Sequence, residues 1–293
     1  MSAFLTELSV AISQASGRPF DIKVSQGVHG GDISQAFKLS DGTRHVFVKV
    51  QPAAKRALFE TEAEGLGELA AANAIRVPHV ICHGVAAGQA YLVLEYLTLD
   101  AHGDAALLGR LLAQQHRVSA PQFGGGGDNW IGATPQPNQR TDQWIDFWRD
   151  QRIGSQLRLA AENGYGGKLQ QDGETLLTDL DAFFAGYTPV PSLLHGDLWG
   201  GNHAYLTDGT PVIFDPAVYF GDRECDLAMT ELFGGFASAF HAAYREAWPL
   251  DAGYAVRKTL YNLYHILNHA NLFGGGYAAQ AQRMVSQLLA QVR

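Results

Sequence analysis

The sequence contains little cysteine: only Cys82 and Cys225 occur among its 293 residues. Neither belongs to a CxxC pair, and their spacing is not typical of metal ligands. A framework built on disulfide bonds is therefore excluded, and a reducing compartment is the expected environment.

The chain also has no long run of basic residues. Its net charge is −8 and its isoelectric point is near 5.7. A nucleic-acid partner would require a positive face for the phosphates, so this class of partner is not expected. A mildly acidic surface would suit a cationic substrate, although it is equally common in proteins without one.

Long apolar runs are absent as well. No uninterrupted stretch reaches the roughly 18 residues that a membrane span requires. The first ten residues, MSAFLTELSV, carry no basic segment and include Glu7 within their apolar stretch, so they do not have the pattern of a signal peptide. We expect a cytoplasmic protein without a membrane partner, and no feature of the sequence indicates an obligate protein partner.

Residues 1–97 have the pattern of a small lobe that contains strands and one helix. Two strand-like runs meet at Gly30-Gly31, and a third follows an Asp-Gly dipeptide of the kind that favours a hairpin. A helix-forming stretch covers residues 54–74, and two more extended runs follow it. We predict five strands with one helix inserted after the third.

The rest of the chain, residues 98–293, is dominated by helical periodicity. With 46% hydrophobic residues, the chain can build one large or two modest cores. We predict an α+β fold of two lobes, residues 1–97 and 98–293, with the flexible boundary near residues 96–103. The helical segments are expected at 104–118, 141–162, 173–186, 222–247 and 253–293.

Three oxygen-bearing side chains follow one another closely in the second lobe. Asp197 and Asn202 lie in the segment HGDLWGGN, and Asp215 follows a buried hairpin strand thirteen residues after Asn202. An oxygen-rich pocket of this kind suits Mg²⁺ together with substrate phosphates. The same five-and-thirteen spacing occurs in the catalytic core of protein kinases, where the first Asp receives the hydroxyl proton and the other two residues hold metal. A single loop Asp would more often be a turn former, but the complete set favours the functional interpretation.

A metal-dependent phosphoesterase is an alternative interpretation of the same residues. His195, Asp197, Asn202 and His203 are then the candidate ligands. That scheme places its two elements on successive β-loop-α units, tens of residues apart, whereas here they are almost contiguous and no upstream DxH occurs. The spacing excludes it.

A nucleotide-binding lobe should also supply a lysine and an acidic partner. Lys49 lies in the apolar strand HVFVKV, where an unpaired ammonium would be costly, and strand alternation places it opposite Val48. On the following helix, Glu62 shares the apolar stripe of Phe59 and Leu66, whereas Glu60 and Glu64 project elsewhere. We predict a Lys49–Glu62 ion pair of the kind that positions a kinase lysine on the α- and β-phosphates; a purely structural salt bridge is the alternative.

Nucleotide contacts are expected from two further segments. Gly30 and Gly31 permit close backbone approach to phosphate oxygens, although the loop matches neither a Walker A nor a GxGxxG motif. In the connection between the lobes, the Glu95 carbonyl and the Leu97 amide are the candidate partners of the adenine edge.

Together these residues resemble the aminoglycoside phosphotransferase-like kinases, which have the two-lobed protein-kinase-like fold. More narrowly, the chain is similar to the fructosamine-kinase family, also called ketosamine-3-kinases, over nearly its full length. The segments that carry this resemblance are GGDI at 30–33, FVKV at 47–50, FETEAEGL at 59–66, IGATPQPN at 131–138, WIDFWRDQRI at 144–153, HGDLWGGN at 195–202, IFDPA at 213–217, GDRECDLA at 221–228 and YNLYHILNHANLFGGGY at 261–277.

The resemblance implies ATP-dependent phosphorylation of the 3-hydroxyl of a ketosamine, with Mg²⁺. The substrates of the family are fructosamine, ribulosamine and related sugar adducts of lysine or protein amines. The 3-phosphate promotes loss of the sugar from the amine, so the resemblance implies a deglycating activity. The chain departs from protein kinases by HGD in place of HRD and DPA in place of DFG, which argues against control by activation-loop phosphorylation. Some eukaryotic members have a redox-active cysteine in the glycine-rich loop, where this chain has Asp32 and no cysteine.

Within this family, Asp197 is expected to be the catalytic base, and Asn202 and Asp215 the metal ligands. His195 is a candidate substrate contact that is expected to brace the loop rather than donate a proton. Asp222 and Asp226 are expected to accept hydrogen bonds from backbone amides. Trp199 is a candidate sugar-stacking residue or simply part of the core. Another small-molecule kinase of the same fold, acting on an aminoglycoside, choline or homoserine, is the alternative function.

Overall fold

The computed structural model describes residues 2–28 and 34–292. Within this part, the chain forms two compact units by its internal contacts. Unit 1 contains the chain up to Asp104 together with Ala204–Pro216, and unit 2 contains Ala105–His203 and Ala217–Arg293. This division by internal contacts does not test the predicted lobe boundary between residues 97 and 98, which stays a prediction.

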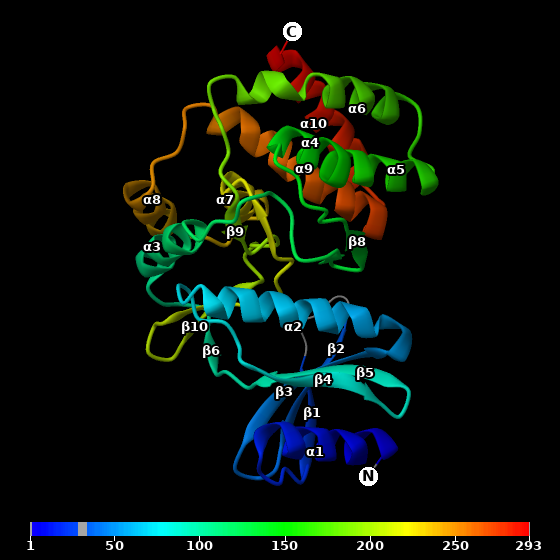
Figure 1. Ribbon diagram of the computed structural model, residues 1–293, viewed down its shortest axis with the longest axis vertical. Helices are drawn as coiled ribbons and strands as arrows, with labels where there is room; N and C mark the ends of the chain where they lie inside the picture. Colours follow the sequence, from blue (N-terminus) through cyan, green and yellow to red (C-terminus); the bar gives the residue numbers. More distant parts are fainter. Residues whose placement is uncertain (1, 29–33, 293) are drawn as a thin grey trace. The chain divides into compact units, whose positions relative to one another are not determined.

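Unit 1 is built on a five-stranded antiparallel sheet with the strand order β1-β2-β3-β5-β4 (Figure 1). All neighbouring strands run antiparallel, which confirms the predicted five-stranded lobe. The strands are β1 (Val24–Val28), β2 (Gln35–Ser40), β3 (His45–Pro52), β4 (Val80–Ala86) and β5 (Gln89–Glu95).

The two faces of this sheet are covered by different helices (Figure 1). α2 (Arg56–Ala71) follows β3 after the short 3₁₀ turn η1 (Ala53–Lys55), as predicted. On the other face lies α1 (Ala3–Ser16), whose Leu8 and Ile12 pack in one core with Val48 and its strand neighbours. α1 is not among the elements expected from the sequence, because its amphipathic pattern is weak.

A second small sheet of unit 1 contains the strand that precedes Asp215. β6 (Leu99–Asp100) pairs with β10 (His203–Leu206), which in turn pairs with β11 (Pro211–Ile213). The β10–β11 pair is the predicted hairpin, and its turn lies at Asp208-Gly209 as expected.

Unit 2 is mainly helical, as predicted, and its core is one large cluster of apolar side chains. Helix α9 contributes most to this cluster and packs against α7, α5 and α10. The helices are α3 (Ala105–His116), α4 (Trp144–Phe147), α5 (Gly154–Glu162), α6 (Lys168–Thr178), α7 (Glu224–Leu232), α8 (Ser238–Ala247), α9 (Tyr254–Phe273) and α10 (Tyr277–Val292). A 3₁₀ turn η3 (Leu180–Phe184) and two short antiparallel strand pairs, β7 (Asn129–Ile131) with β8 (Thr134–Gln136) and β9 (Ser192–Leu194) with β12 (Tyr219–Gly221), complete the unit.

The helix expected at 141–162 is not a regular α-helix throughout. A π-helical segment, η2 (Trp148–Ile153), separates α4 from α5. At its end Gly154 has no room for a side chain, because a Cβ there would lie 2.5 Å from the carbonyl oxygen of Arg149. The widened turn buries both Trp148 and Arg152, which are 1% and 0% exposed.

Among the described residues, no helix combines the length and the apolar character that crossing a bilayer requires.

His265 on α9 makes the stability of unit 2 sensitive to acid. Burial, followed by the nearby His269, lowers the pKa of His265 to about 3, below its ordinary value of 6.5. Between these two values the unfolded chain binds a proton that the folded chain does not, so stability falls as the pH falls from about 6.5 toward 3. We expect His265→Leu to remove up to ~1.4 kcal/mol per pH unit of this dependence. Urea unfolding of both proteins at several pH values measures it, and equal slopes would contradict the assignment.

Candidate active site

Lys49 lies in β3 and is held by two carboxylates. Its Nζ donates to Oε1 of Glu62 at 2.7 Å and to Oδ1 of Asp215 at 2.7 Å. The lysine side chain is only 11% exposed. The predicted Lys49–Glu62 ion pair is thus present, and Asp215 is a second partner that the sequence analysis did not foresee.

Helix α2 presents Glu62 to the sheet because this residue lies on the apolar stripe of the helix. Glu62 is buried together with Phe59 and Leu66, as the periodicity predicted. By contrast, Glu64 is exposed, and Glu60 pairs with Arg56 at 2.6 Å on the outer surface. The choice of Glu62 among the three glutamates is confirmed as the partner of Lys49.

The Lys49 cluster carries more negative than positive charge. Burial alone would lower the pKa of Lys49, but the carboxylates of Asp215 and Glu62 outweigh burial and raise this pKa above its ordinary value. The ammonium therefore stays protonated at neutral pH. With one ammonium and two carboxylates the cluster has a formal excess of one negative charge, which suits a further cation nearby.

Asp215 follows β11, and its backbone is fixed by unit 1. The strand is aligned by a hydrogen bond from the Ile213 amide to the Arg76 carbonyl, 3.0 Å long. Asp215 itself has a φ of 57°, in the left-handed region that Asp tolerates better than most residues. Its side chain is 43% exposed. The aspartate is thus presented at the end of a buried strand, as predicted.

In unit 2, Asp197 and Asn202 are brought together by the loop that contains them. Nδ2 of Asn202 donates to the backbone oxygen of Asp197 at 2.9 Å and to its Oδ2 at 3.2 Å. The amide of Asp197 donates to Nδ1 of His195 at 3.2 Å, and His195 is fully buried. His195 therefore braces the loop, which agrees with the predicted role.

The backbone that leads into Asp197 is clamped by a buried carboxylate. Asp226 on α7 accepts hydrogen bonds from the amides of His195 and Gly196, at 2.7 and 2.9 Å. It also bonds Nε2 of His116 at 3.1 Å. At Gly196 the φ is 83°, and a Cβ there would collide with the carbonyl oxygen of Ala217. The loop is therefore held in a conformation that requires glycine.

Asp222 has a similar structural role at the start of α7. It accepts from the Glu224 amide at 3.0 Å and from the hydroxyls of Tyr187 and Tyr261. The prediction that Asp222 and Asp226 bond backbone amides is confirmed. The His116 contact with Asp226 was missed, because nothing in the local sequence connects residues so far apart.

Trp199 is 38% exposed, which excludes the core alternative. Its indole lies over Gly201, where a Cβ would collide with the ring. The other side of the loop is also tight, since Gly200 packs against the backbone of Gly234 and Gly235. By contrast, Trp144 and Trp148 are core residues.

Of the residues predicted to contact the nucleotide through their backbone, Glu95 and Leu97 lie within the described part of the chain. Gly30 and Gly31 lie outside the described residues. Glu95 ends β5, and its carboxylate is bound by Nη2 of Arg76 at 2.5 and 2.6 Å. Its side chain is thus engaged within unit 1, so the candidates for the adenine edge stay the backbone carbonyl of Glu95 and the backbone amide of Leu97.

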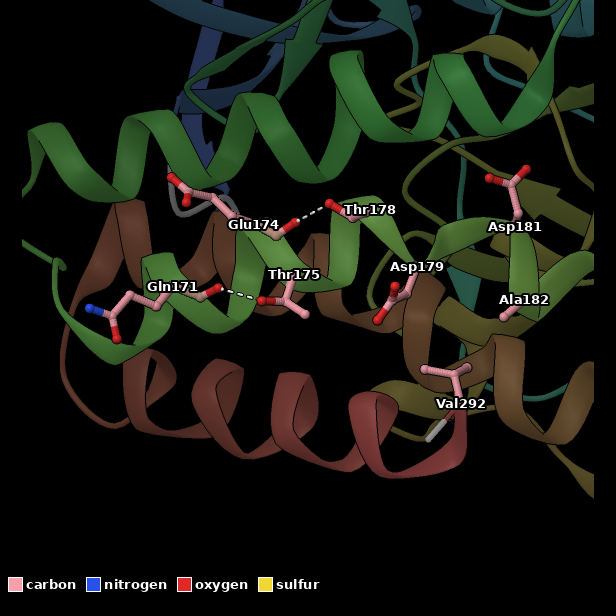
Figure 2. A pocket seen from close by; sticks show the side chains of 8 residues that line it. All are labelled: Gln171, Glu174, Thr175, Thr178, Asp179, Asp181, Ala182 and Val292. Atoms are coloured by element: carbon pink, nitrogen blue, oxygen red, sulfur yellow. Dashed lines mark hydrogen bonds between the residues drawn. The ribbon is translucent and has the colours of Figure 1, made fainter.

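Unit 2 also has a surface hollow. Figure 2 shows it between α6, η3 and the end of α10. None of its lining residues was singled out from the sequence, and none belongs to the Asp197 loop. They are Gln171, Glu174, Thr175, Thr178, Asp179, Asp181, Ala182 and Val292.

The fold and these residues define a kinase-like protein with a lysine–glutamate pair in one unit and an aspartate–asparagine loop in the other. Solved structures with the same fold include a thermostable mutant of the aminoglycoside phosphotransferase APH(4)-Ia, at 16% identity and a TM-score of 0.63 over 97% of this chain and 98% of that one. A structure from Haemophilus somnus 129PT, described as a "putative fructosamine-3-kinase", is 30% identical with a TM-score of 0.90 over 98% of both chains.

Sequence comparison narrows this class to one family. The family model for fructosamine kinase matches residues 4–291, so the chain belongs to the fructosamine kinase family. Among curated proteins, the "probable ketoamine kinase slr1563" of Synechocystis is 50% identical over 95% of this chain and 94% of its own length. The chloroplastic protein-ribulosamine 3-kinase of Arabidopsis thaliana is 38% identical over 94% of this chain and 86% of its own length.

The clamp on the Asp197 loop predicts a specific loss in Asp226→Asn. One of the two carboxylate oxygens becomes an NH₂ group that faces N–H donors, so a buried hydrogen bond is lost and a donor is left unpaired. We expect the free energy of unfolding to fall by about 2–4 kcal/mol and the phosphotransfer rate to fall with it. Urea unfolding and steady-state kinetics measure both.

Asp208→Asn is the matched control, because Asp208 accepts a backbone hydrogen bond from Thr210 in the exposed hairpin turn. It should change stability and rate very little. Equal losses in the two variants would show that the clamp has no special role.

Proposed function

We propose that this chain is an ATP-dependent kinase that phosphorylates the 3-hydroxyl of ketosamines, sugar adducts of lysine or protein amines. One observation carries the proposal. Relatives named for ketoamine and ribulosamine phosphorylation align over 94–95% of the chain, and the chain retains a complete set of polar residues for phosphoryl transfer.

Lys49 is proposed to bind the α- and β-phosphates of ATP. The two carboxylates that hold its Nζ at 2.7 Å keep it charged and fix its position before any ligand arrives. Because the ammonium is already in place, no reorganisation energy is needed to stabilise the negative charge that shifts between phosphate oxygens during the reaction. The Glu95 carbonyl and Leu97 amide are proposed for the adenine edge, and the backbone of Gly30 and Gly31 for the phosphates.

Asp197 is proposed as the residue that orients the sugar hydroxyl and accepts its proton. Its carboxylate accepts a hydrogen bond from Asn202 Nδ2, and its backbone is fixed through His195. A base held this way can meet the acceptor hydroxyl with little loss of orientational entropy.

Mg²⁺ is the metal that this chemistry implies, and Asn202 and Asp215 are proposed to hold it. Their donor atoms fit a hard cation: because Nδ2 of Asn202 is turned to Asp197, its Oδ1 is the amide atom suited to a metal, and Asp215 offers a partly exposed carboxylate. Since the two residues belong to different units, the assignment rests on this chemistry. The bound ion would neutralise charge on the ATP phosphates.

Trp199 is proposed to contact the acceptor. Its large hydrophobic side chain is 38% exposed, and it is two residues from Asp197. An indole face can stack on a sugar ring or on the apolar chain of a lysine adduct.

An acceptor screen tests the function directly. We expect ATP consumption with ribulose-lysine or fructose-lysine and none with kanamycin, and Asp197→Asn should lower kcat by at least about 100-fold. Phosphate placement on the sugar is checked by NMR of the product. Turnover of kanamycin alone would reject the ketosamine assignment, and full activity of Asp197→Asn would remove the proposed base.

The role of the Lys49 cluster predicts a difference between two neighbouring glutamates. In Glu62→Gln the buried lysine loses one of its two charged partners, so we expect KM for ATP to rise and kcat/KM to fall by about 10-fold or more. Glu60→Gln, which alters only an exposed pair with Arg56, should leave both constants near the unmodified values. Similar kinetics for the two variants would contradict the proposed role of Glu62.

A further inference from the structure

Gln136, at the end of β8, is a fully buried polar residue of unit 2. Both its amide nitrogen and its amide oxygen have hydrogen-bond partners, which fix the orientation of the amide. Its Nε2 donates to Oδ1 of Asn129 at 2.8 Å and to the backbone oxygen of Ala217 at 3.2 Å. Its Oε1 accepts from the Tyr264 hydroxyl at 2.7 Å. Burial raises the pKa of Tyr264 to about 12, so this hydroxyl keeps its proton and donates.

The Ala217 carbonyl that Gln136 holds lies against the loop before Asp197. The amide of Ala217 donates to the His195 carbonyl at 2.8 Å. Its carbonyl oxygen occupies the space that a side chain at Gly196 would need. Both backbone groups of Ala217 therefore constrain the two residues that lead directly into Asp197.

The hairpin of β7 and β8 holds the neighbouring carbonyl in the same way. Nδ2 of Asn129 donates to the Val218 oxygen at 2.8 Å. Asn129 is held in turn by Asn138, whose Nδ2 donates to its Oδ1 at 2.8 Å, and Asn138 accepts from Nη2 of the buried Arg152 at 2.7 Å. Two successive carbonyls are thus bound by amides of one hairpin, which is supported from the core by a buried cation.

We propose that Gln136 is a positioning residue for the phosphotransfer reaction: through the Ala217 carbonyl it fixes the His195–Gly196 turn and so the orientation of Asp197. It does not touch the substrate. This inference rests on the proposed function of Asp197 as the base that orients the acceptor hydroxyl.

Gln136→Glu tests the proposal with almost no change in side-chain size. The variant can still accept from Tyr264, but a carboxyl group, ionised or protonated, cannot donate to both the Ala217 oxygen and Asn129 Oδ1, as the amide does. A repelled carbonyl shifts the turn before Asp197, and small misplacements of a catalytic group lower the rate strongly. We expect kcat to fall by about 10- to 100-fold while KM for ATP and for the ketosamine stay within about 2-fold.

Gln156→Glu is the matched control. Gln156 is also a buried glutamine of unit 2, 2% exposed, and it bonds Asn268 at 3.2 Å and Asn271 at 2.8 Å on α9. It shares the Tyr264 hydroxyl with Gln136, but its bonds to Asn268 and Asn271 do not reach the Ala217 carbonyl, so the pair of variants isolates the contact with the loop backbone. This variant should lose a comparable amount of thermal stability, yet its kcat should stay within about 2-fold of the unmodified enzyme. Equal kcat losses at equal stability loss would overturn the proposal, as would an unchanged kcat in Gln136→Glu or a change in ketosamine KM alone.

Amide hydrogen exchange of the full-length protein gives a readout that does not depend on turnover. We expect faster exchange at His195, Gly196 and Asp197 in Gln136→Glu and not in Gln156→Glu; unchanged exchange would overturn the inference. If the unmodified enzyme phosphorylates no ketosamine, the proposed function fails. The hydrogen-exchange comparison of the two variants still tests whether Gln136 fixes the turn before Asp197. Should Gln136→Glu not fold, Tyr264→Phe replaces it, and its kcat must fall by at least about 3-fold with both KM values unchanged.

Discussion

One buried carboxylate, Asp226, organises the loop on which the proposed chemistry depends. It compensates its own desolvation by accepting two backbone amides and contacting His116, so the charge is fully engaged inside the protein. A glycine with positive φ lies between the two anchored peptide planes and Asp197. The loop is therefore held firmly where it precedes Asp197, and such restraint is what the proposed role of orienting a hydroxyl needs.

The Lys49 cluster stabilises a buried positive charge, again through carboxylates at hydrogen-bond distance. A lysine buried in an apolar sheet would tend to lose its proton, but two carboxylates reverse that tendency. Because Asp215 comes from the hairpin of β10 and β11, a segment far along the chain completes the small unit. Unit 1 thus holds the Lys49 ammonium and Asp215, a proposed metal ligand, in direct contact with each other.

Much of this could be predicted from the sequence, because it depends on local periodicity. Alternation along β3 placed Lys49 opposite the valines, and the apolar stripe of α2 selected Glu62 among three glutamates. Turn dipeptides located the hairpin before Asp215. Three of the features that were missed depend on tertiary contacts: the second carboxylate on Lys49, the histidine on Asp226, and the amide of Gln136 on Ala217. No residue spacing encodes these three side-chain contacts, since they join residues 166, 110 and 81 positions apart. The π-helical turn that buries Arg152 is local, but the regular helical period does not distinguish it from an α-helix.

The glycine beneath Trp199 has a consequence for how the acceptor range of such an enzyme could change. Since the indole occupies the volume above Gly201, the two positions share one space and cannot vary independently. A larger residue at 201 would push the ring outward and alter the surface that we propose for the acceptor, without changing a charged group. Diversification of acceptor preference could therefore proceed through this small uncharged position and leave the phosphate chemistry intact.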